Sequence, residues 1–112
     1  MKWTVVCPYL RLERERGVAA LVDGVQVALF RTFDDGLYAI GNLDPISGAA
    51  VLSRGIVGSR GDTPVVASPM HKQAYDLTTG ECLDEPSVRV PVYPVRVNAG
   101  MVEIACLVGE PA

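Results

Sequence analysis

The chain has 112 residues, the length of one small domain, and we expect a single domain over residues 1–112. Apolar residues make up 49% of the chain and charged residues 21%, a balance that excludes an intrinsically disordered protein. Ten basic and thirteen acidic residues give a formal net charge of −3, which argues against nucleic-acid binding, because phosphate contacts need an excess of Lys and Arg.

A charged run of alternating sign, residues 11–16, is the first feature of the chain and predicts a solvated turn or a short helical segment. A hydrophobic period of two follows in residues 25–30 (VQVALF) and predicts a strand. Its two faces would carry Val25, Val27 and Leu29 on one side and Gln26, Ala28 and Phe30 on the other. The turn at residues 34–36 and the strand-like residues 37–40 (LYAI) complete a β-hairpin, because Asp-Gly tolerates the positive φ that such turns need.

The middle of the chain is rich in loops. We expect a short helical turn over residues 48–52, with Ser47 as its N-cap, and a flexible surface loop over residues 55–61 (GIVGSRG). A further turn, Thr78-Thr79-Gly80, would join residues 74–77 (AYDL) to residues 81–83 (ECL).

A last hairpin is predicted from residues 93–97 and 101–105 around Asn98-Ala99-Gly100. Val102, Ile104 and Cys106 would share its core face, and Glu103 would lie on the opposite face. Eleven glycines and eight prolines divide the chain at intervals typical of antiparallel sandwiches and barrels. The sequence therefore predicts a compact all-β fold.

His71 is the single histidine of the chain, and a histidine in such a loop usually suggests a metal ligand or a proton-transfer group. A hydrolytic site is disfavoured because Ser68, three residues earlier, has no nucleophile-elbow sequence around it. A zinc site with Cys7, Cys82 and Cys106 is disfavoured because structural zinc usually recruits closely spaced ligand pairs. Residues 55–61 lack the Lys-Ser/Thr ending of a phosphate-binding loop.

The three scattered cysteines also bear on the compartment. Their odd number and the absence of a CxxC pair predict reduced thiols and no disulfides, as in the cytoplasm. The chain runs from Met1 directly into strand-like sequence and has no apolar stretch of about 20 residues, so we expect no targeting segment and no membrane span.

Two loops, about residues 41–55 and 67–80, carry the most specific sequence. In the second, Pro69 and His71 precede Tyr75-Asp76-Leu77, Thr79-Gly80 and Cys82-Leu83. With these elements the chain resembles the Rieske iron–sulfur family, in which one loop carries Cys-x-His and the next carries Cys-x-x-His, two cysteines holding one iron and two histidines the other. The resemblance implies a Rieske-like [2Fe–2S] domain fold, with small antiparallel sheets forming a sandwich or partial barrel.

The ligand positions of that family are degenerate in this chain. The resemblance places Asp44 and Ile46 at the first-loop positions and Ser68 and His71 at the second-loop positions. Ile46 has no donor atom, and His71 is the one customary ligand of the four. We therefore expect no metal and no cofactor on this chain.

One branch of the Rieske fold lacks the cluster ligands in this way: the small subunit of the cytoplasmic assimilatory NAD(P)H-dependent nitrite reductase. The chain is similar to this branch in the Asn-x-Asp-Pro element at residues 42–45, in residues 52–58 (LSRGIVG) and along nearly its whole length. The resemblance implies a cytoplasmic, non-catalytic subunit of nitrate and nitrite assimilation, with no catalytic residue of its own. Its partner would be a large subunit that carries FAD, an Fe–S cluster and sirohaem and reduces nitrite to ammonium with electrons from NAD(P)H.

The same resemblance suggests a partner interface at the tip of the two loops, at Asp44, Pro45, Ser68, Pro69, His71 and Lys72. The alternative is that these residues only stabilise the loops, Asp44 and Ser68 by hydrogen bonds to backbone amides and the prolines by stiffening the turns. Two other functions remain open at this point. The chain could be a Rieske-type ferredoxin that carries electrons, or a cluster-free docking module of another oxidoreductase system.

Overall fold

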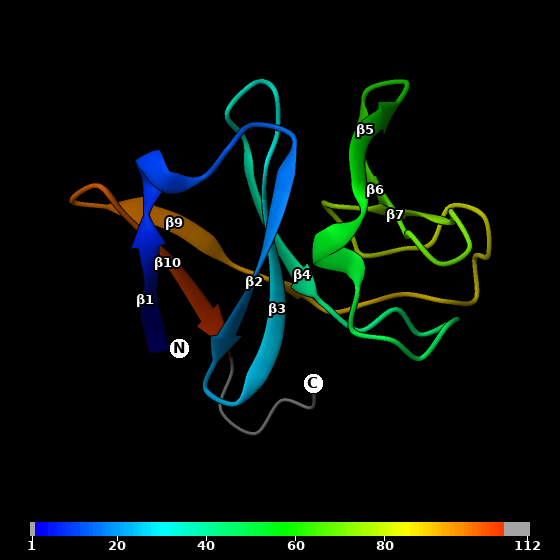
Figure 1. Cartoon of the computed structure of the whole chain (residues 1–112), viewed down its shortest axis with the longest axis horizontal. Coiled ribbons are helices and arrows are strands. Elements are labelled where there is room, and N and C mark those ends of the chain that lie inside the picture. Colours follow the sequence, from blue (N-terminus) through cyan, green and yellow to red (C-terminus); the bar gives the residue numbers. More distant parts are fainter. Residues whose placement is uncertain (1, 107–112) are drawn as a thin grey trace.

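The computed structural model describes residues 2–106, which form antiparallel sheets and two short 3₁₀ helices (Figure 1). The strands are β1 (Lys2–Pro8), β2 (Arg16–Val22), β3 (Val25–Arg31), β4 (Leu37–Gly41), β5 (Ile56–Arg60), β6 (Thr63–Ala67), β7 (Ala74–Asp76), β8 (Val92–Tyr93), β9 (Val95–Asn98) and β10 (Met101–Cys106). The helices are η1 (Tyr9–Arg11) and η2 (Leu52–Arg54). The all-β prediction is confirmed. Within the described residues, no helix is long and apolar enough to cross a membrane.

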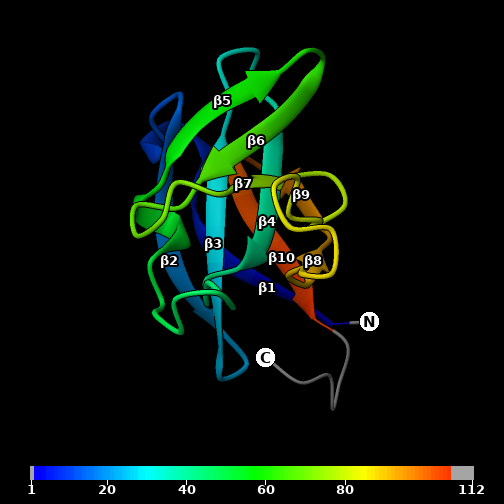
Figure 2. The ribbon, with the colours of Figure 1, turned by 90° about the vertical axis from the view of Figure 1, so that its right-hand side faces the viewer.

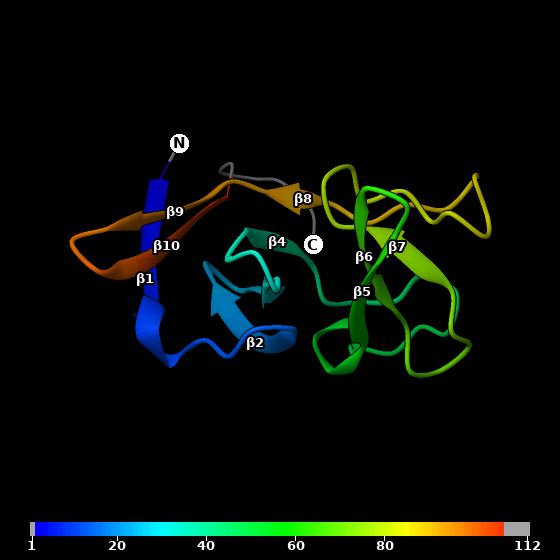
Figure 3. The same ribbon diagram turned by 90° about the horizontal axis from the view of Figure 1, so that it is seen from above.

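The strands form three sheets that follow one another along the long axis of the molecule (Figures 1 and 3). The sheet β1-β10-β9 lies at one end, β2-β3-β4-β8 lies in the middle, and β5-β6-β7 lies at the other end. Seen from the far end, β5 and β6 cross in front of β3 and β4 (Figure 2). The middle sheet is therefore covered on both of its faces.

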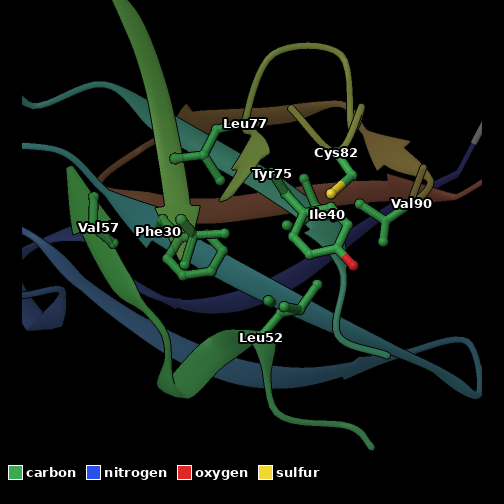
Figure 4. Close-up of a cluster of buried hydrophobic side chains, with 10 residues drawn as sticks. Phe30, Ile40, Leu52, Val57, Tyr75, Leu77, Cys82 and Val90 are labelled. Carbon is green, nitrogen blue, oxygen red and sulfur yellow. The ribbon is translucent and has the colours of Figure 1, made fainter. Parts of the chain in front are cut away.

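Strand β3 shows how one sequence builds two cores. Val27 and Leu29 belong to a buried cluster shared with β10, while Ala28 and Phe30 belong to a second cluster shared with η2, β5, β6 and β7. The predicted facing of the VQVALF residues is confirmed. Figure 4 shows Phe30 of this second cluster beside Val57. Because side chains alternate along β3, this one strand contributes to both core clusters and packs against the sheets at both ends of the molecule.

The predicted hairpins match the structure. β3 pairs with β4 across the turn at residues 32–36, and β9 pairs with β10 across Ala99 and Gly100. In the β7 hairpin the pairing beyond the turn is reduced to a bridge between Tyr75 and Cys82.

Glu103 lies on the face of β10 opposite the core, as expected, yet it is buried. Arg96 donates a 2.6 Å hydrogen bond to the Glu103 carboxylate, and its guanidinium lies over the ring of Trp3. The buried carboxylate is therefore paired with a cation.

Two local predictions were wrong. Residues 55–61 are not a flexible loop: residues 56–60 form β5, which pairs with β6 and buries Val57 against the second core cluster. Residues 48–52 do not form the predicted helical turn. The 3₁₀ helix begins later, at Leu52, and the hydroxyl of Ser47 accepts a hydrogen bond from the Ala49 amide within the loop instead of capping a helix. Residues 11–16 follow the prediction of a solvated turn, with Leu12 alone buried.

Candidate functional site

The first of the two singled-out loops leaves β4 and is clamped at its base by Asn42. The side-chain oxygen of Asn42 accepts a 2.7 Å hydrogen bond from the Ser53 amide, and its side-chain nitrogen donates to the carbonyl of Ala50. Its backbone carbonyl accepts from the Leu52 amide. A buried Asn with both ends of its amide paired holds the two ends of the loop together. The Asn of the Asn-x-Asp-Pro element is therefore structural.

Asp44, two residues further on, is fully buried and accepts hydrogen bonds through both carboxylate oxygens. The Ser68 hydroxyl donates to Oδ2 at 2.6 Å, and the Tyr75 hydroxyl donates to Oδ1 at 2.7 Å. Within its own loop, the backbone amide of Ile46 donates to Oδ1 at 3.0 Å. Asp44 thus joins the first loop to the second.

The second loop turns around Ser68, which is also buried. The Ser68 amide donates to the carbonyl of Gln73, and the Ser68 carbonyl accepts from the amide of Lys72. The Ser68 hydroxyl accepts a 3.3 Å hydrogen bond from the Met70 amide while it donates to Asp44. Lys72 closes the turn with a φ of +63°, in the left-handed region.

Tyr75 connects this network to the core. Its ring is fully buried in the second core cluster near Ile40, Cys82 and Leu52, and its hydroxyl points out of the cluster (Figure 4). The strand β7 carries Tyr75 into this position through pairing with Val66 of β6.

The network fixes the protonation of both acids. Burial acts to raise the pKa of Asp44, but the hydrogen bonds from Ser68, Tyr75 and Ile46 outweigh it and hold the pKa below its usual value. Burial and the bond to Asp44 raise the pKa of the Tyr75 phenol. Asp44 is thus a carboxylate and Tyr75 a neutral donor near neutral pH, which is the arrangement that makes their hydrogen bond strong.

The six residues of the predicted interface divide into two groups. Asp44 and Ser68 are buried and cannot offer their side chains to a partner, whereas Pro45, Pro69, His71 and Lys72 are exposed. The amides of Ile46 and Met70 donate hydrogen bonds to the side chains of Asp44 and Ser68, which are the contacts expected if these two residues stabilise their loops.

Sequence reasoning missed the part that Tyr75 plays. The residue stood out as an element of a pattern, but a hydrogen bond between residues 31 positions apart leaves no trace in spacing. The signal that could have pointed to it is chemical: a buried tyrosine needs a partner for its hydroxyl.

The architecture and the loops match a known family over almost the whole described chain. The model of the Rieske-like [2Fe-2S] domain matches residues 2–105. The chain belongs to the Rieske-like family. The fold predicted from the resemblance is confirmed by this match and by the structural neighbour described next.

Within this family the relatives are nitrite reductase subunits. The nitrite reductase (NADH) small subunit of Salmonella typhimurium is 38% identical over 104 residues, covering 92% of this chain and 96% of that protein. A crystal structure from Mycobacterium tuberculosis, provisionally described as an NADH-dependent nitrite reductase small subunit, is 54% identical, with a TM-score of 0.92 over 95% of this chain and 96% of that one. This Rieske-like chain therefore groups with the small subunits.

A third relative differs in length. The nitrite reductase [NAD(P)H] large subunit of Klebsiella oxytoca is 40% identical over 100 residues, which cover 89% of this chain but 10% of that protein. The Rieske-like chain spans a tenth of the length of this relative. The same domain thus occurs both as a small separate protein and as a segment of a much longer polypeptide.

The residues at the ligand positions do not fit the iron–sulfur cluster that the family name implies. Asp44 and Ser68, which the resemblance places at the cysteine positions, converge and bond to each other. Ile46, which the resemblance places at a histidine position, has no donor, and His71 is exposed on the second loop. Rieske clusters need two thiolates and two imidazoles, so one imidazole of the four ligands cannot hold the cluster. Within residues 2–106, no three His, Cys, Asp or Glu side chains are grouped as metal ligands.

Proposed function

We propose that this Rieske-like chain is the cluster-free, non-catalytic small subunit of a cytoplasmic NAD(P)H-dependent nitrite reductase, and that it acts by binding the large subunit. The observation that carries the proposal is the Klebsiella relative: a domain 40% identical to this chain is there part of the large subunit itself. A domain that exists both fused to a protein and separate from it is expected to contact that protein in either form. FAD, sirohaem and an Fe–S cluster would then reside on the large subunit, which would reduce nitrite to ammonium.

The geometry of the loops supports a binding role over a chemical one. Ser68 and Asp44 are both buried, so no substrate can reach the hydroxyl, and Asp44 has both oxygens occupied by donors from Ser68, Tyr75 and Ile46. Groups that are satisfied by one another inside the protein serve stability. A small domain of this kind also gains stability when it docks, because binding to the folded state shifts the folding equilibrium.

The experiment that tests the proposal mixes the purified full-length chain with the purified large subunit of the same organism. We expect a stable complex in size-exclusion chromatography and in calorimetry, and we expect a chain that is colourless and free of iron. A ferredoxin would instead show visible absorption and stoichiometric iron, and a docking module of another oxidoreductase would leave the large subunit unbound. Either result would overturn the proposal.

A strain that lacks the chain separates two ways of supporting the large subunit. Loss of the large-subunit polypeptide would show that the chain stabilises it. Normal abundance of that polypeptide with reduced NAD(P)H-dependent nitrite turnover would show that the chain supports activity. Normal abundance and normal turnover together would contradict a supporting role.

A further inference from the structure

Large apolar side chains are exposed at the tip of both loops. Leu43 is 50% exposed, Ile46 37% and Met70 53%, and the exposed Pro45 and Pro69 lie between or beside them. Single exposed apolar residues are ordinary on protein surfaces, but several on two adjoining loops mark an interaction site. We use the name loop tip for residues 43–46 and 69–72.

The loop tip is held rigid from beneath. The hydrogen bond from Ser68 to Asp44 joins the two loops directly below their exposed residues, and Tyr75 anchors the same carboxylate to the core. A surface that is fixed before binding loses less conformational entropy when a partner docks. The buried hydrogen bonds therefore hold the exposed residues of the loop tip in place before a partner binds.

The charge of the loop tip differs from that of the chain as a whole. The chain carries thirteen acidic and ten basic residues, yet the only carboxylate in the loop tip, Asp44, is buried and fully paired. Lys72 and His71 are exposed there. The loop tip is thus an apolar surface that presents a cation and no exposed carboxylate, which favours a partner surface that is apolar and acidic.

Lys72 has a left-handed backbone conformation, which glycine adopts more easily than lysine. Its φ of +63° lies in the left-handed region, which glycine enters without a steric penalty. Strained residues of this kind are concentrated at functional positions. Four other non-glycine residues of the described chain, Glu15, Asp23, Asp35 and Ala99, also have a positive φ, so what distinguishes Lys72 is that its exposed side chain stands at the loop tip.

A groove continues the apolar surface from the first loop toward the middle sheet. It has a volume of about 430 Å³, and its lining includes Leu43 and Pro45 of the loop tip with Val90 and Pro91 of the segment before β8. Arg89 also lines it. The groove can accept an apolar side chain from a partner. The guanidinium of Arg89 is already engaged within the chain, by an ion pair with Glu81 at 3.8 Å and a hydrogen bond to the carbonyl of Thr79, so Lys72 is the cation that a partner carboxylate would face.

We infer that the loop tip and this groove form the surface that binds the large subunit, through an apolar face of the large subunit that carries carboxylates opposite Lys72. This inference rests on the proposed function and specifies its interface. The loop tip lies at the end of the molecule opposite β1 and β10, where the chain begins and the described residues end (Figures 1 and 3). A covalent linker at either of those strands would leave the loop tip free to dock.

The test compares full-length variants for binding to the purified large subunit by calorimetry. We expect Met70→Ser and Lys72→Glu each to raise the dissociation constant by about ten-fold or more, as for central interface residues. The matched controls are Leu10→Ser, which removes an 88% exposed apolar side chain on η1, and Lys2→Glu on β1. Both controls lie at the opposite end and should change the dissociation constant less than about two-fold.

Lys72→Gly separates binding from folding. Glycine relieves the strained φ, so the melting temperature should stay the same or rise, while affinity falls and its dependence on salt becomes weaker. If the native chain binds but the loop-tip variants bind as tightly as it does, or the controls weaken binding equally, the inference is wrong and the proposed function stands. If the native chain does not bind the large subunit, the proposed function fails as well.

Discussion

The hydroxyl of Ser68 donates a 2.6 Å hydrogen bond to the carboxylate of Asp44, 24 residues earlier in the chain. In cluster-bearing Rieske proteins the two cysteines bind the same iron, so the two side chains must converge. Asp44 and Ser68, which the resemblance places at the cysteine positions, also converge, and a charge-assisted hydrogen bond joins them. The two loops are joined by hydrogen bonds from protein groups to Asp44, so the contribution of each donor to stability can be measured by mutation.

Tyr75→Phe removes one donor from Asp44 and leaves the aromatic ring in the core. A hydrogen bond to a charged group contributes about 1.5–3 kcal/mol, so we expect the free energy of unfolding to fall by about that amount in urea titrations. Tyr38→Phe is the matched control, because Tyr38 packs against the same core cluster and is only partly buried. We expect a change below about 0.5 kcal/mol there. Equal decreases in the free energy of unfolding in the two variants would show that the hydrogen bond to Asp44 contributes nothing specific to stability.

The lowered pKa of Asp44 makes stability depend on pH with a definite sign. The carboxyl of an unfolded chain titrates near about 3.9, and the folded value lies below this. The contribution of Asp44 is therefore complete above about pH 4 and is lost as the pH falls through the folded pKa. Asp44→Asn should lower the free energy of unfolding by about 1–3 kcal/mol at pH 7 and flatten its decline at acid pH.

This pH dependence is measured by urea unfolding between neutral pH and pH 3. Asp34, Asp35 and Asp84 also have lowered pKa values and contribute an acid-sensitive background in every variant. The decisive quantity is therefore the difference between the native chain and Asp44→Asn. A constant difference at all pH values would contradict the assignment of a depressed pKa to Asp44.

The sequence predicted those parts of the fold that depend on neighbouring residues. The β3–β4 hairpin follows from alternation in residues 25–30 and from a turn that allows the positive φ of Asp35. Strand β5 was not predicted, because Val57 is the single buried residue among residues 56–60 and Gly58 is typical of loop sequence. A strand with one buried side chain has no hydrophobic period to detect.

The site was predicted in position but not in detail. The resemblance placed Asp44 and Ser68 on two loops, and the structure shows them buried and bonded to each other rather than exposed at the surface. That bond depends on how η2, β5 and β6 bring the second loop against the first, which is tertiary packing. The exposure of Leu43 and Met70 depends on the same packing and was also outside the reach of local patterns.

Substitution of Gly80 tests the turn that follows β7, next to this site. Its φ is +81°, and a β-carbon added there would lie 2.1 Å from the carbonyl oxygen of Val90, whose amide donates to the Gly80 carbonyl. We expect Gly80→Ala to destabilise by about 3 kcal/mol or more, from backbone strain and from a clash with main chain. The control is Gly61→Ala, where φ is +60° but no atom lies within 4 Å of the added carbon. Its cost should be only the strain, about 1 kcal/mol, in the same urea titration.

The convergence of the loops also predicts what a restored ligand set would do. In the triple variant Asp44→Cys, Ile46→His, Ser68→Cys, the two thiols would replace side chains that already meet, and the new imidazole would stand with His71 on the exposed side. Reconstitution with iron and sulfide should give visible absorption and about two irons per chain. The native chain, which has three cysteines elsewhere, and the triple variant with His71→Ala should stay colourless under the same treatment. A triple variant with native circular dichroism but no iron would show that these loops no longer hold the geometry of a Rieske site.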